Sequence, residues 1–201
     1  MIVLGLTGSI GMGKTTVAKE FIDLGFPVFE ADSYVHYLLE NDDFLLKKIK
    51  INYPDCFVSG KIDRDLLANL VFNNSDLDLI EEIIHPLVNN GVQEFIKLHK
   101  SEDKSLVVIE MPLLIETGTH RKCDVVILVT ASEEIQKKRV LKRKNMSIAR
   151  FNFLISRQLP GDIKIKEADF VIDTEKDISE IKLQIIHIAN TLVPQYSRNN
   201  L

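Results

Sequence analysis

An apolar run that passes directly into a glycine-rich turn constrains the fold of this chain more than any other feature. Residues 2–6 read IVLGL, and residues 8–15 read GSIGMGKT. A continuous run of Val, Ile and Leu predicts a strand buried on both faces, as in a parallel sheet. After the turn, Val17, Phe21 and Leu24 recur at spacings of four and three, which predicts one apolar stripe of a helix. The chain is therefore expected to begin with a strand, a tight loop and a helix.

The loop itself has the pattern of a phosphate-binding site. Residues 8–15 match G-x-x-x-x-G-K-[ST] and stand between a predicted strand and a predicted helix, where that pattern has physical meaning. Glycines let the backbone wrap around an anion, and the helix N-terminus adds about half a positive charge. Lys14 is expected to reach the β- and γ-phosphates of a nucleotide, and Thr15 to bind Mg²⁺. The alternative is a simple glycine-rich turn with an exposed lysine. The expected phosphate ligands are Gly11, Met12, Gly13, Lys14, Thr15 and Thr16.

Four further apolar runs predict buried strands, at residues 27–29, 106–109, 125–129 and 170–172. With residues 2–6 they predict an α/β fold of three layers, α/β/α, around a central parallel sheet of five strands. Gly25 and Pro27 mark the end of the first helix. Residues 33–101 are helix-like almost throughout and predict a helical insertion between strands.

Composition and charge exclude several classes of protein. The 201 residues are 45% hydrophobic and 27% charged, which is ordinary for a globular protein. The net charge of −4 argues against a general nucleic-acid binder. Cys56 and Cys123 lie too far apart for a metal site or a disulfide framework. No basic signal-peptide region is visible, and no stretch approaches the roughly 20 apolar residues of a membrane span. We expect a cytoplasmic protein.

Asp32, in the sequence FEADSY, directly follows the second predicted strand. Ligands of parallel sheets bind outside the carboxyl ends of the strands, so this carboxylate is a candidate for contact with an acceptor hydroxyl. If the strand persisted this far, Glu30 and Asp32 would point to the same side. Alternatively, Asp32 or Ser33 only caps the next helix. Position alone does not separate the two interpretations.

Six of the eight residues at 137–144, KKRVLKRK, are basic. The preceding sequence TASE, from Thr130 to Glu133, matches a capping box, and a helix is expected to run on through Arg139 and Arg143. Two arginines four apart project from one face of a helix and could together bind phosphates. The alternative is a solvated basic face.

The remaining signals favour a small-molecule kinase. The guanine-reading string Asn-Lys-x-Asp and the string Asp-x-x-Gly of GTPase switches are both absent. Glu110, at the end of the third apolar run, either orients a metal-bound water or merely starts a turn. A kinase needs a carboxylate near the acceptor, an acceptor pocket and cations over the phosphates. The chain offers candidates for each.

Taken together, these motifs resemble the dephospho-CoA kinase family. The resemblance covers nearly the whole chain, and IIHPLV and MPLLIE are far more specific than the loop alone. It implies a P-loop kinase that transfers the ATP γ-phosphoryl group to the 3′-hydroxyl of dephospho-CoA, giving coenzyme A and ADP. It also implies a nucleotide-binding core at 1–32, 102–131 and 165–201, a dephospho-CoA-binding insertion at 33–101 and a lid at 132–164. The matching segments are LTGSIGMGKTTVAKEF, LGFPVFEAD, DRDLLANLVF, EEIIHPLV, MPLLIE, DVVILV, QKKRVLKRK and EADFVID.

The resemblance also implies roles for single residues. Asp32 matches the acidic residue that orients or deprotonates the acceptor hydroxyl, and Arg139 matches the lid arginine that reaches the phosphates. Without the resemblance, His85 would be interpreted as a core histidine and Arg64 as a surface residue. The matching substrate-binding positions are Thr7, Asp32, Arg64 and His85, and Arg143 is a weaker companion of Arg139.

The chain also departs from the family's pattern. Thr174 stands where the family often has Asn, which puts the adenine-side pocket in doubt, and Ala68 stands where it often has a second Arg. The segment SRQLPGDIKIKEAD keeps Gln158 and Lys164 at matching positions, with a Pro-Gly pair between them. None of these changes removes a part that the chemistry requires.

The expected partners are therefore small molecules: ATP with Mg²⁺, and dephospho-CoA, with no nucleic acid and no membrane. The expected assembly is a monomer or a weak homo-oligomer. One alternative is a kinase of similar layout that acts on a nucleoside monophosphate or another metabolite. The other is a nucleotide-dependent regulatory or nucleic-acid-binding protein that uses residues 137–144.

Overall fold

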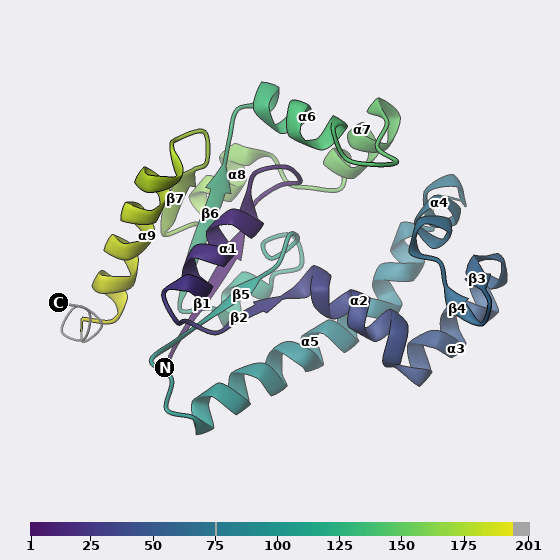
Figure 1. Ribbon diagram of the computed structural model, residues 1–201, viewed down its shortest axis with the longest axis horizontal. Coiled ribbons are helices and arrows are strands. Elements are labelled where there is room, and N and C mark those ends of the chain that lie inside the picture. The colour runs from purple at the N-terminus through teal and green to yellow at the C-terminus, as the bar shows by residue number, and fades with distance from the viewer. Residues whose placement is uncertain (75, 195–201) are drawn as a thin grey trace. The chain divides into compact units, whose positions relative to one another are not determined.

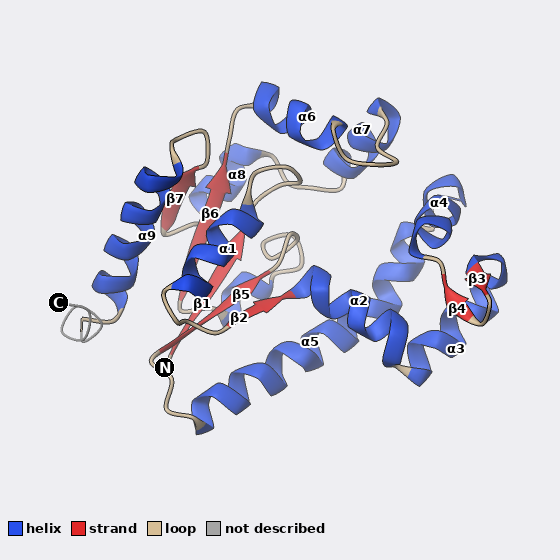
Figure 2. Cartoon of the chain, viewed as in Figure 1, coloured by secondary structure: helices blue, strands red, loops and turns tan. Residues whose placement is uncertain are grey.

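The protein is described here by a computed structural model, which covers residues 1–74 and 76–194. It divides into two compact units. The core unit comprises Met1–Phe29 and the chain from Ile96 onward, and the insertion unit comprises Glu30–Phe95. Helices and strands of both units are drawn in Figures 1 and 2. Among the described residues, no helix has the length and apolar character needed to cross a membrane.

A parallel sheet of five strands forms the centre of the core unit, as predicted. Each predicted strand is confirmed, and each ends one residue later than expected. Helices flank the sheet in a three-layer α/β/α arrangement (Figure 2). β1 lies between β5 and β6, so the strand order reverses at β1, and ligands of such sheets bind at this point. The sheet order β2-β5-β1-β6-β7 is built from β1 (Ile2–Thr7), β2 (Val28–Glu30), β5 (Leu106–Glu110), β6 (Val125–Thr130) and β7 (Phe170–Asp173).

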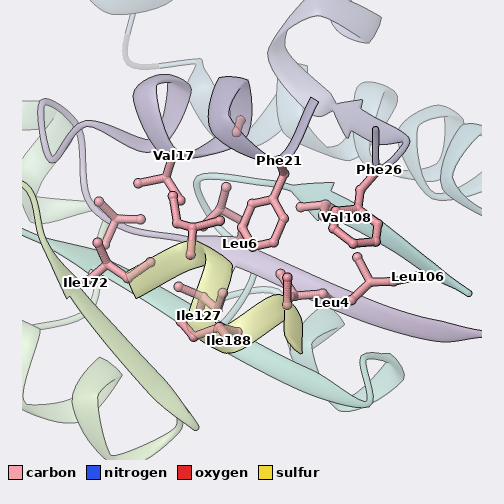
Figure 3. Packing of buried hydrophobic residues seen from close by; sticks show 14 of the residues in the cluster. Leu4, Leu6, Val17, Phe21, Phe26, Leu106, Val108, Ile127, Ile172 and Ile188 are labelled. Carbon is pink, nitrogen blue, oxygen red and sulfur yellow. The ribbon is translucent and has the colours of Figure 1, made fainter. Parts of the chain in front are cut away.

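One face of the sheet packs on α1 (Lys14–Asp23) and α9 (Ile178–Leu192), and Figure 3 shows this core from close by. Leu4 and Leu6 of β1 are fully buried in it. Val17 and Phe21 are fully buried as well, so the predicted apolar stripe of the first helix is confirmed. Burial of side chains of this size contributes roughly 1.5–3 kcal/mol each. The helix stops as expected, because Gly25 adopts the left-handed conformation at φ 84° that favours glycine.

Gly5 lets the loop after β5 pack closely on the middle of β1. A Cβ atom on Gly5 would lie 2.6 Å from Leu114 Cδ2 and 2.9 Å from Cys123 Sγ. Burial raises the pKa of the Cys123 thiol to about 11, so this thiol is protonated at neutral pH. Cys56 and Cys123 are both free, in agreement with the expectation that they form no disulfide.

The segment after β6 contains α6 (Glu133–Leu141), α7 (Ile148–Ser156) and α8 (Gly161–Lys166). The predicted capping box is wrong, because β6 continues through Thr130, whose hydroxyl donates to the Ile172 carbonyl at 3.4 Å. Ser132 caps α6 instead, and its hydroxyl accepts from the Ile135 N–H at 3.4 Å.

The expectation that Arg139 and Arg143 share one helical face is also wrong. α6 ends at Leu141, and the Arg143 N–H bonds to the Val140 carbonyl at 3.0 Å in a tight turn. The chain then turns again at Asn145, which has a positive φ of 59°. Arg139 thus stands on the helix, whereas Arg143 is exposed beyond its end.

The insertion unit is mainly helical, as predicted, but it also holds a short hairpin that the sequence analysis did not anticipate. Ser59 and Gly60 form its two-residue turn, and both have positive φ, as a tight hairpin turn requires. α2 packs tightly on α5, since a Cβ atom on Gly91 would lie 2.3 Å from the Tyr34 ring. The elements are α2 (Ala31–Asn41), α3 (Asp43–Asn52), η1 (Pro54–Cys56), β3 (Phe57–Val58), β4 (Lys61–Ile62), α4 (Arg64–Asn74) and α5 (Leu77–Ser101), whose last turns belong to the core unit.

Candidate functional site

The glycine-rich loop joins β1 to α1, as the sequence predicts, and each of its three glycines lets another element come close. A Cβ atom on Gly8 would lie 2.5 Å from the Val129 carbonyl oxygen of β6. On Gly11, at φ 79°, it would lie 2.5 Å from Val140 of α6. On Gly13, at φ 91°, it would lie 3.0 Å from the Thr174 hydroxyl oxygen. The glycines therefore allow the loop to be enclosed by β6, α6 and the turn after β7.

The start of α1 is suited to an anion. Gly13 is its N-cap and has no side chain to satisfy the first N–H groups, and the first turn has no acidic residue. Thr15 and Thr16 are exposed in that turn. The Lys14 ammonium donates to the Gly8 carbonyl at 2.8 Å, so it folds back along the loop. Backbone donors, two hydroxyls and an ammonium group thus converge on one site, which is the composition of a phosphate site.

Two polar residues are buried where β1 and β5 end side by side. Thr7 is fully buried, and its hydroxyl donates to the Pro112 carbonyl at 3.3 Å. Glu110 is 5% exposed and pairs in register with Leu6. Glu110 therefore lies at the carboxyl edge of the sheet, level with Leu6, which is two residues before the start of the loop at Gly8.

Arg139 is held by Thr174, in the turn that follows β7. Its guanidinium donates to the Thr174 hydroxyl and to the Thr174 carbonyl, both at 2.8 Å, and to the Gly11 carbonyl at 3.5 Å. The Thr174 hydroxyl in turn donates to the Met12 carbonyl at 2.7 Å. Arg139 is thus fixed against the outer side of the loop by a residue that departs from the family's usual Asn. Its contact with phosphates remains a prediction.

A second contact ties α6 to the same turn. The Glu175 carboxylate accepts a hydrogen bond from the Ser132 N–H, at the N-cap of α6. This hydrogen bonding to Ser132, and then the positive charge of Arg139, hold the pKa of Glu175 below its usual range. The turn after β7 therefore contacts the start of α6 through Glu175 and its last turn through Thr174.

Replacing Thr174 by valine is expected to weaken ATP binding about three- to tenfold. Valine has the same shape, but it removes one hydrogen bond to Arg139 and one to Met12, and a hydrogen bond contributes about 0.5–1.5 kcal/mol. Titration calorimetry with Mg·ATP measures the change. Thr174→Ser keeps the hydroxyl and serves as the control. Equal affinity in the valine and serine variants would contradict this role.

The sequence-predicted acidic residue, Asp32, lies in the first turn of α2, in the insertion unit, and is exposed. The capping alternative is wrong, because Glu30 is the N-cap and Ser33 donates its hydroxyl to the Glu30 carboxylate at 3.3 Å. The condition under which Glu30 and Asp32 would share one side of a strand is not met. β2 ends at Glu30, and the helix starts with the next residue. The Asp32 carboxylate therefore does not cap α2.

Two further predicted substrate contacts, Arg64 and His85, also lie in the insertion unit, whereas Thr7 lies in the core unit. Arg64 is exposed at the first position of α4, after Asp63, whose carboxylate accepts from the Leu66 N–H at 3.0 Å. His85 lies in α5 immediately before Pro86 and is partly exposed, so it is not a fully buried core histidine. Their substrate contacts stay predictions.

Sequence reasoning assigned no role to four residues that hold the first half of the loop. Gln136 and Gln158 bond to the backbone of Ile10, and Lys164 and Glu116 form an ion pair beside Ser9. The sequence did single out Gln158 and Lys164, because they stand at positions that match the family's pattern. Gln136 also stands in a matching segment, QKKRVLKRK, but the sequence gave no role for it, because its partner lies 126 residues away along the chain.

The oxygen donors at the site fit Mg²⁺. Within residues 1–74 and 76–194, no group of three or more His, Cys, Asp or Glu residues could hold a metal ion by itself. Magnesium that is bound to nucleotide phosphates needs only one or two protein ligands and keeps several waters. The exposed Thr15 hydroxyl at the helix start and the Glu110 carboxylate at the next strand end are donors of the required kind.

Comparisons with known proteins identify the family. A sequence model described as dephospho-CoA kinase matches residues 2–180. A dephospho-CoA kinase of Rhodopseudomonas palustris is 41% identical over 189 residues, which are 94% of each chain. Among solved structures, a Thermus thermophilus protein is 33% identical with a TM-score of 0.74 and covers 94% of this chain and 95% of its own. The dephospho-CoA kinase of Campylobacter jejuni is 26% identical with a TM-score of 0.69 and covers 99% and 98%. The chain therefore belongs to the dephospho-CoA kinase family.

Proposed function

We propose that this protein transfers the γ-phosphoryl group of ATP to the 3′-hydroxyl of dephospho-CoA, giving coenzyme A and ADP in the last step of coenzyme A biosynthesis. The observation that carries the proposal is the phosphate-binding loop on a helix start that lacks acidic residues, in a chain that belongs to the family from residue 2 to residue 180. The proposed donor is ATP with Mg²⁺, and the proposed acceptor is a small molecule. We further propose a cytoplasmic monomer or weak homo-oligomer.

The proposed chemistry is positioning and charge neutralisation. The loop N–H groups and Lys14 hold the β- and γ-phosphates. Thr15 would hold Mg²⁺, and Glu110 is a candidate to hold one of its waters; when bound, the metal would supply positive charge to the phosphate oxygens. Arg139 is proposed to add positive charge from the outer side of the loop. Residues 132–164 act as a lid that excludes water, which would otherwise compete as an acceptor.

On the acceptor side, the insertion at residues 33–101 is proposed to bind dephospho-CoA. Arg64 and His85 are proposed to supply contacts there, and Thr7, just ahead of the loop, is proposed as a further substrate contact. Asp32 aims the 3′-hydroxyl at the γ-phosphorus and takes its proton. An exposed carboxylate that caps no helix is available for this task.

An acceptor screen tests the proposal. ADP release from Mg·ATP is measured with dephospho-CoA, AMP, CMP or shikimate as acceptor, and the product is weighed by mass spectrometry. We expect stimulation by dephospho-CoA alone and a product heavier by one phosphoryl group. Stimulation by another acceptor would assign a different kinase activity.

The alternative of a nucleic-acid-binding regulator makes a different prediction. Residues 137–144 are basic, so binding through them would weaken steeply as salt is raised. Tight, salt-dependent RNA or DNA binding without phosphotransfer to any acceptor would favour it. The net charge of −4 counts against this alternative.

A further inference from the structure

The backbone of Ile10, inside the phosphate-binding loop, is held from two sides by glutamine side chains. The Ile10 N–H donates to Gln158 Oε1 at 3.1 Å, and Gln136 Nε2 donates to the Ile10 carbonyl at 2.8 Å. Gln136 lies in α6, and Gln158 lies between α7 and α8. The two ends of the segment 132–164 therefore hold one residue of the loop.

The direction of both hydrogen bonds follows from the partners. A backbone N–H only donates and a carbonyl only accepts, so Gln158 must present its oxygen and Gln136 its nitrogen. Gln136 is 5% exposed, which leaves its amide little access to water as a substitute partner. Gln158 thus acts as a hydrogen-bond acceptor and Gln136 as a donor, and neither could take the other's role.

Close packing supports the contact on the side of α6. Where a Cβ atom on Gly11 would stand, Val140 Cγ2 is 2.5 Å away and the Gln136 carbonyl oxygen 3.1 Å away. The residue after Ile10 therefore lies directly on the helix that carries Gln136. The close contact leaves no space for a side chain at Gly11 between the loop and α6.

A buried ion pair supports the side of Gln158. Lys164 is 1% exposed, and its ammonium lies 2.6 Å from Glu116 Oε1 and 3.3 Å from the Ser9 hydroxyl. Glu116 Oε1 also accepts from the Leu159 N–H at 3.0 Å. Such a pair adds little net stability, because removing both charges from water offsets their attraction. Its effect here is geometric: it fixes Ser9 and the residue next to Gln158 to one another.

We propose that Gln136 and Gln158 are positioning residues that set the direction of the phosphate-binding N–H groups, with the Glu116–Lys164 pair as support. The peptides on both sides of Ile10 are fixed by the two amides, and the neighbouring loop N–H groups point where those peptides direct them. ATP affinity therefore depends on each glutamine. The inference rests on the proposed function in one respect, which is that the loop binds ATP.

Replacing each glutamine in turn by glutamate tests the proposal, because both substitutions add the same charge. A carboxylate accepts hydrogen bonds but cannot donate them, so Gln158→Glu keeps its bond to Ile10, whereas Gln136→Glu loses it. Both variants add the same single negative charge near the loop. We expect the Kd of Gln136→Glu for Mg·ATP to exceed that of Gln158→Glu about tenfold, as expected for loss of one buried hydrogen bond. In both, the KM for dephospho-CoA should stay within twofold of the wild type. Calorimetry without acceptor and steady-state kinetics provide these values.

Lysine substitutions give the reciprocal test. An ammonium donates but does not accept, so Gln136→Lys keeps its bond and Gln158→Lys loses it, and the order of the two ATP affinities should reverse. This pair also decides the matter if Gln136→Glu fails to fold. Gln93→Glu, at an exposed position of α5, is the surface control.

Two outcomes would overturn the inference. One is equal ATP affinity within each matched pair. The other is a lowered Tm with wild-type ATP affinity, which would leave the glutamines a structural role only. A wild-type protein that binds no ATP would instead count against the proposed function, so the two failures are distinguishable.

Discussion

Asp32→Ala is expected to reduce kcat by about 10²-fold or more while leaving the affinity for ATP close to that of the wild type. General-base catalysis contributes roughly 10²–10⁴-fold, and this carboxylate has no capping role in α2 that its loss would disturb. Because the residue is exposed, the variant should also keep the wild-type Tm. Stopped-time assays of coenzyme A formation, together with ATP titrations, measure both quantities.

Two further variants help to interpret the result. One distinguishes alignment of the acceptor hydroxyl from removal of its proton, and the other is a control. Asp32→Asn keeps an oxygen that can accept the hydroxyl hydrogen bond but removes the base, so it reports alignment without proton transfer. Asp43→Ala removes another exposed aspartate, from the first turn of α3, and is the matched control. A kcat near that of the wild type in Asp32→Ala would remove Asp32 from the catalytic site.

Lys14→Met should lower kcat/KM for ATP by roughly 10²–10³-fold, the range seen when one preorganised donor to a developing charge is lost. Methionine keeps most of the side-chain length but removes the charge. The ammonium of Lys14 already lies over the loop, 2.8 Å from the Gly8 carbonyl, so little reorganisation precedes phosphate binding. Unlike the change at Asp32, this one should weaken ATP binding and turnover together.

Lys19→Met, on the exposed side of the same helix, is the control for general loss of positive charge. If Lys14→Met bound ATP and turned over like this control, the interpretation of residues 8–15 as a phosphate site would be wrong. The assay is the same coupled measurement of ADP release over a range of ATP concentrations.

The layout of the core unit was predictable because its signals are local. Buried parallel strands are continuous apolar runs, and the loop has a pattern that requires a strand before it and a helix after it. Each strand was found, and each ended one residue later than predicted. The added residues are polar but still pair in the sheet or extend it: Thr7, Glu30, Glu110, Thr130 and Asp173. Polarity alone therefore marks a strand end one residue too early here.

The failures have a different cause. The capping box was assigned to Thr130 because the pattern fits, but Thr130 pairs with Asp173 in the sheet, and Ser132 caps the helix instead. Arg143 was placed on the helix by its spacing from Arg139, whereas the chain turns after Leu141. In each case, tertiary contacts or a turn overrode a local pattern.

Residues that hold the loop from outside were the least predictable part of the site. Thr174 was noted only as a departure, yet it contacts Arg139 and Met12. Gln136 stands in the family-matching segment QKKRVLKRK, yet no role was predicted for it. Contacts that join residues more than a hundred positions apart depend on the finished fold, and no spacing in the sequence encodes them.

The two hydrogen bonds to the Ile10 backbone determine which amino acids this position can accept. Both glutamines bind main-chain atoms, so the contact is indifferent to the identity of the side chain at residue 10. Proline is the exception, since it has no N–H to donate to Gln158. Variation at this position among natural or engineered versions of the chain is therefore a poor guide to its importance, because the functional constraint is carried by the peptide groups.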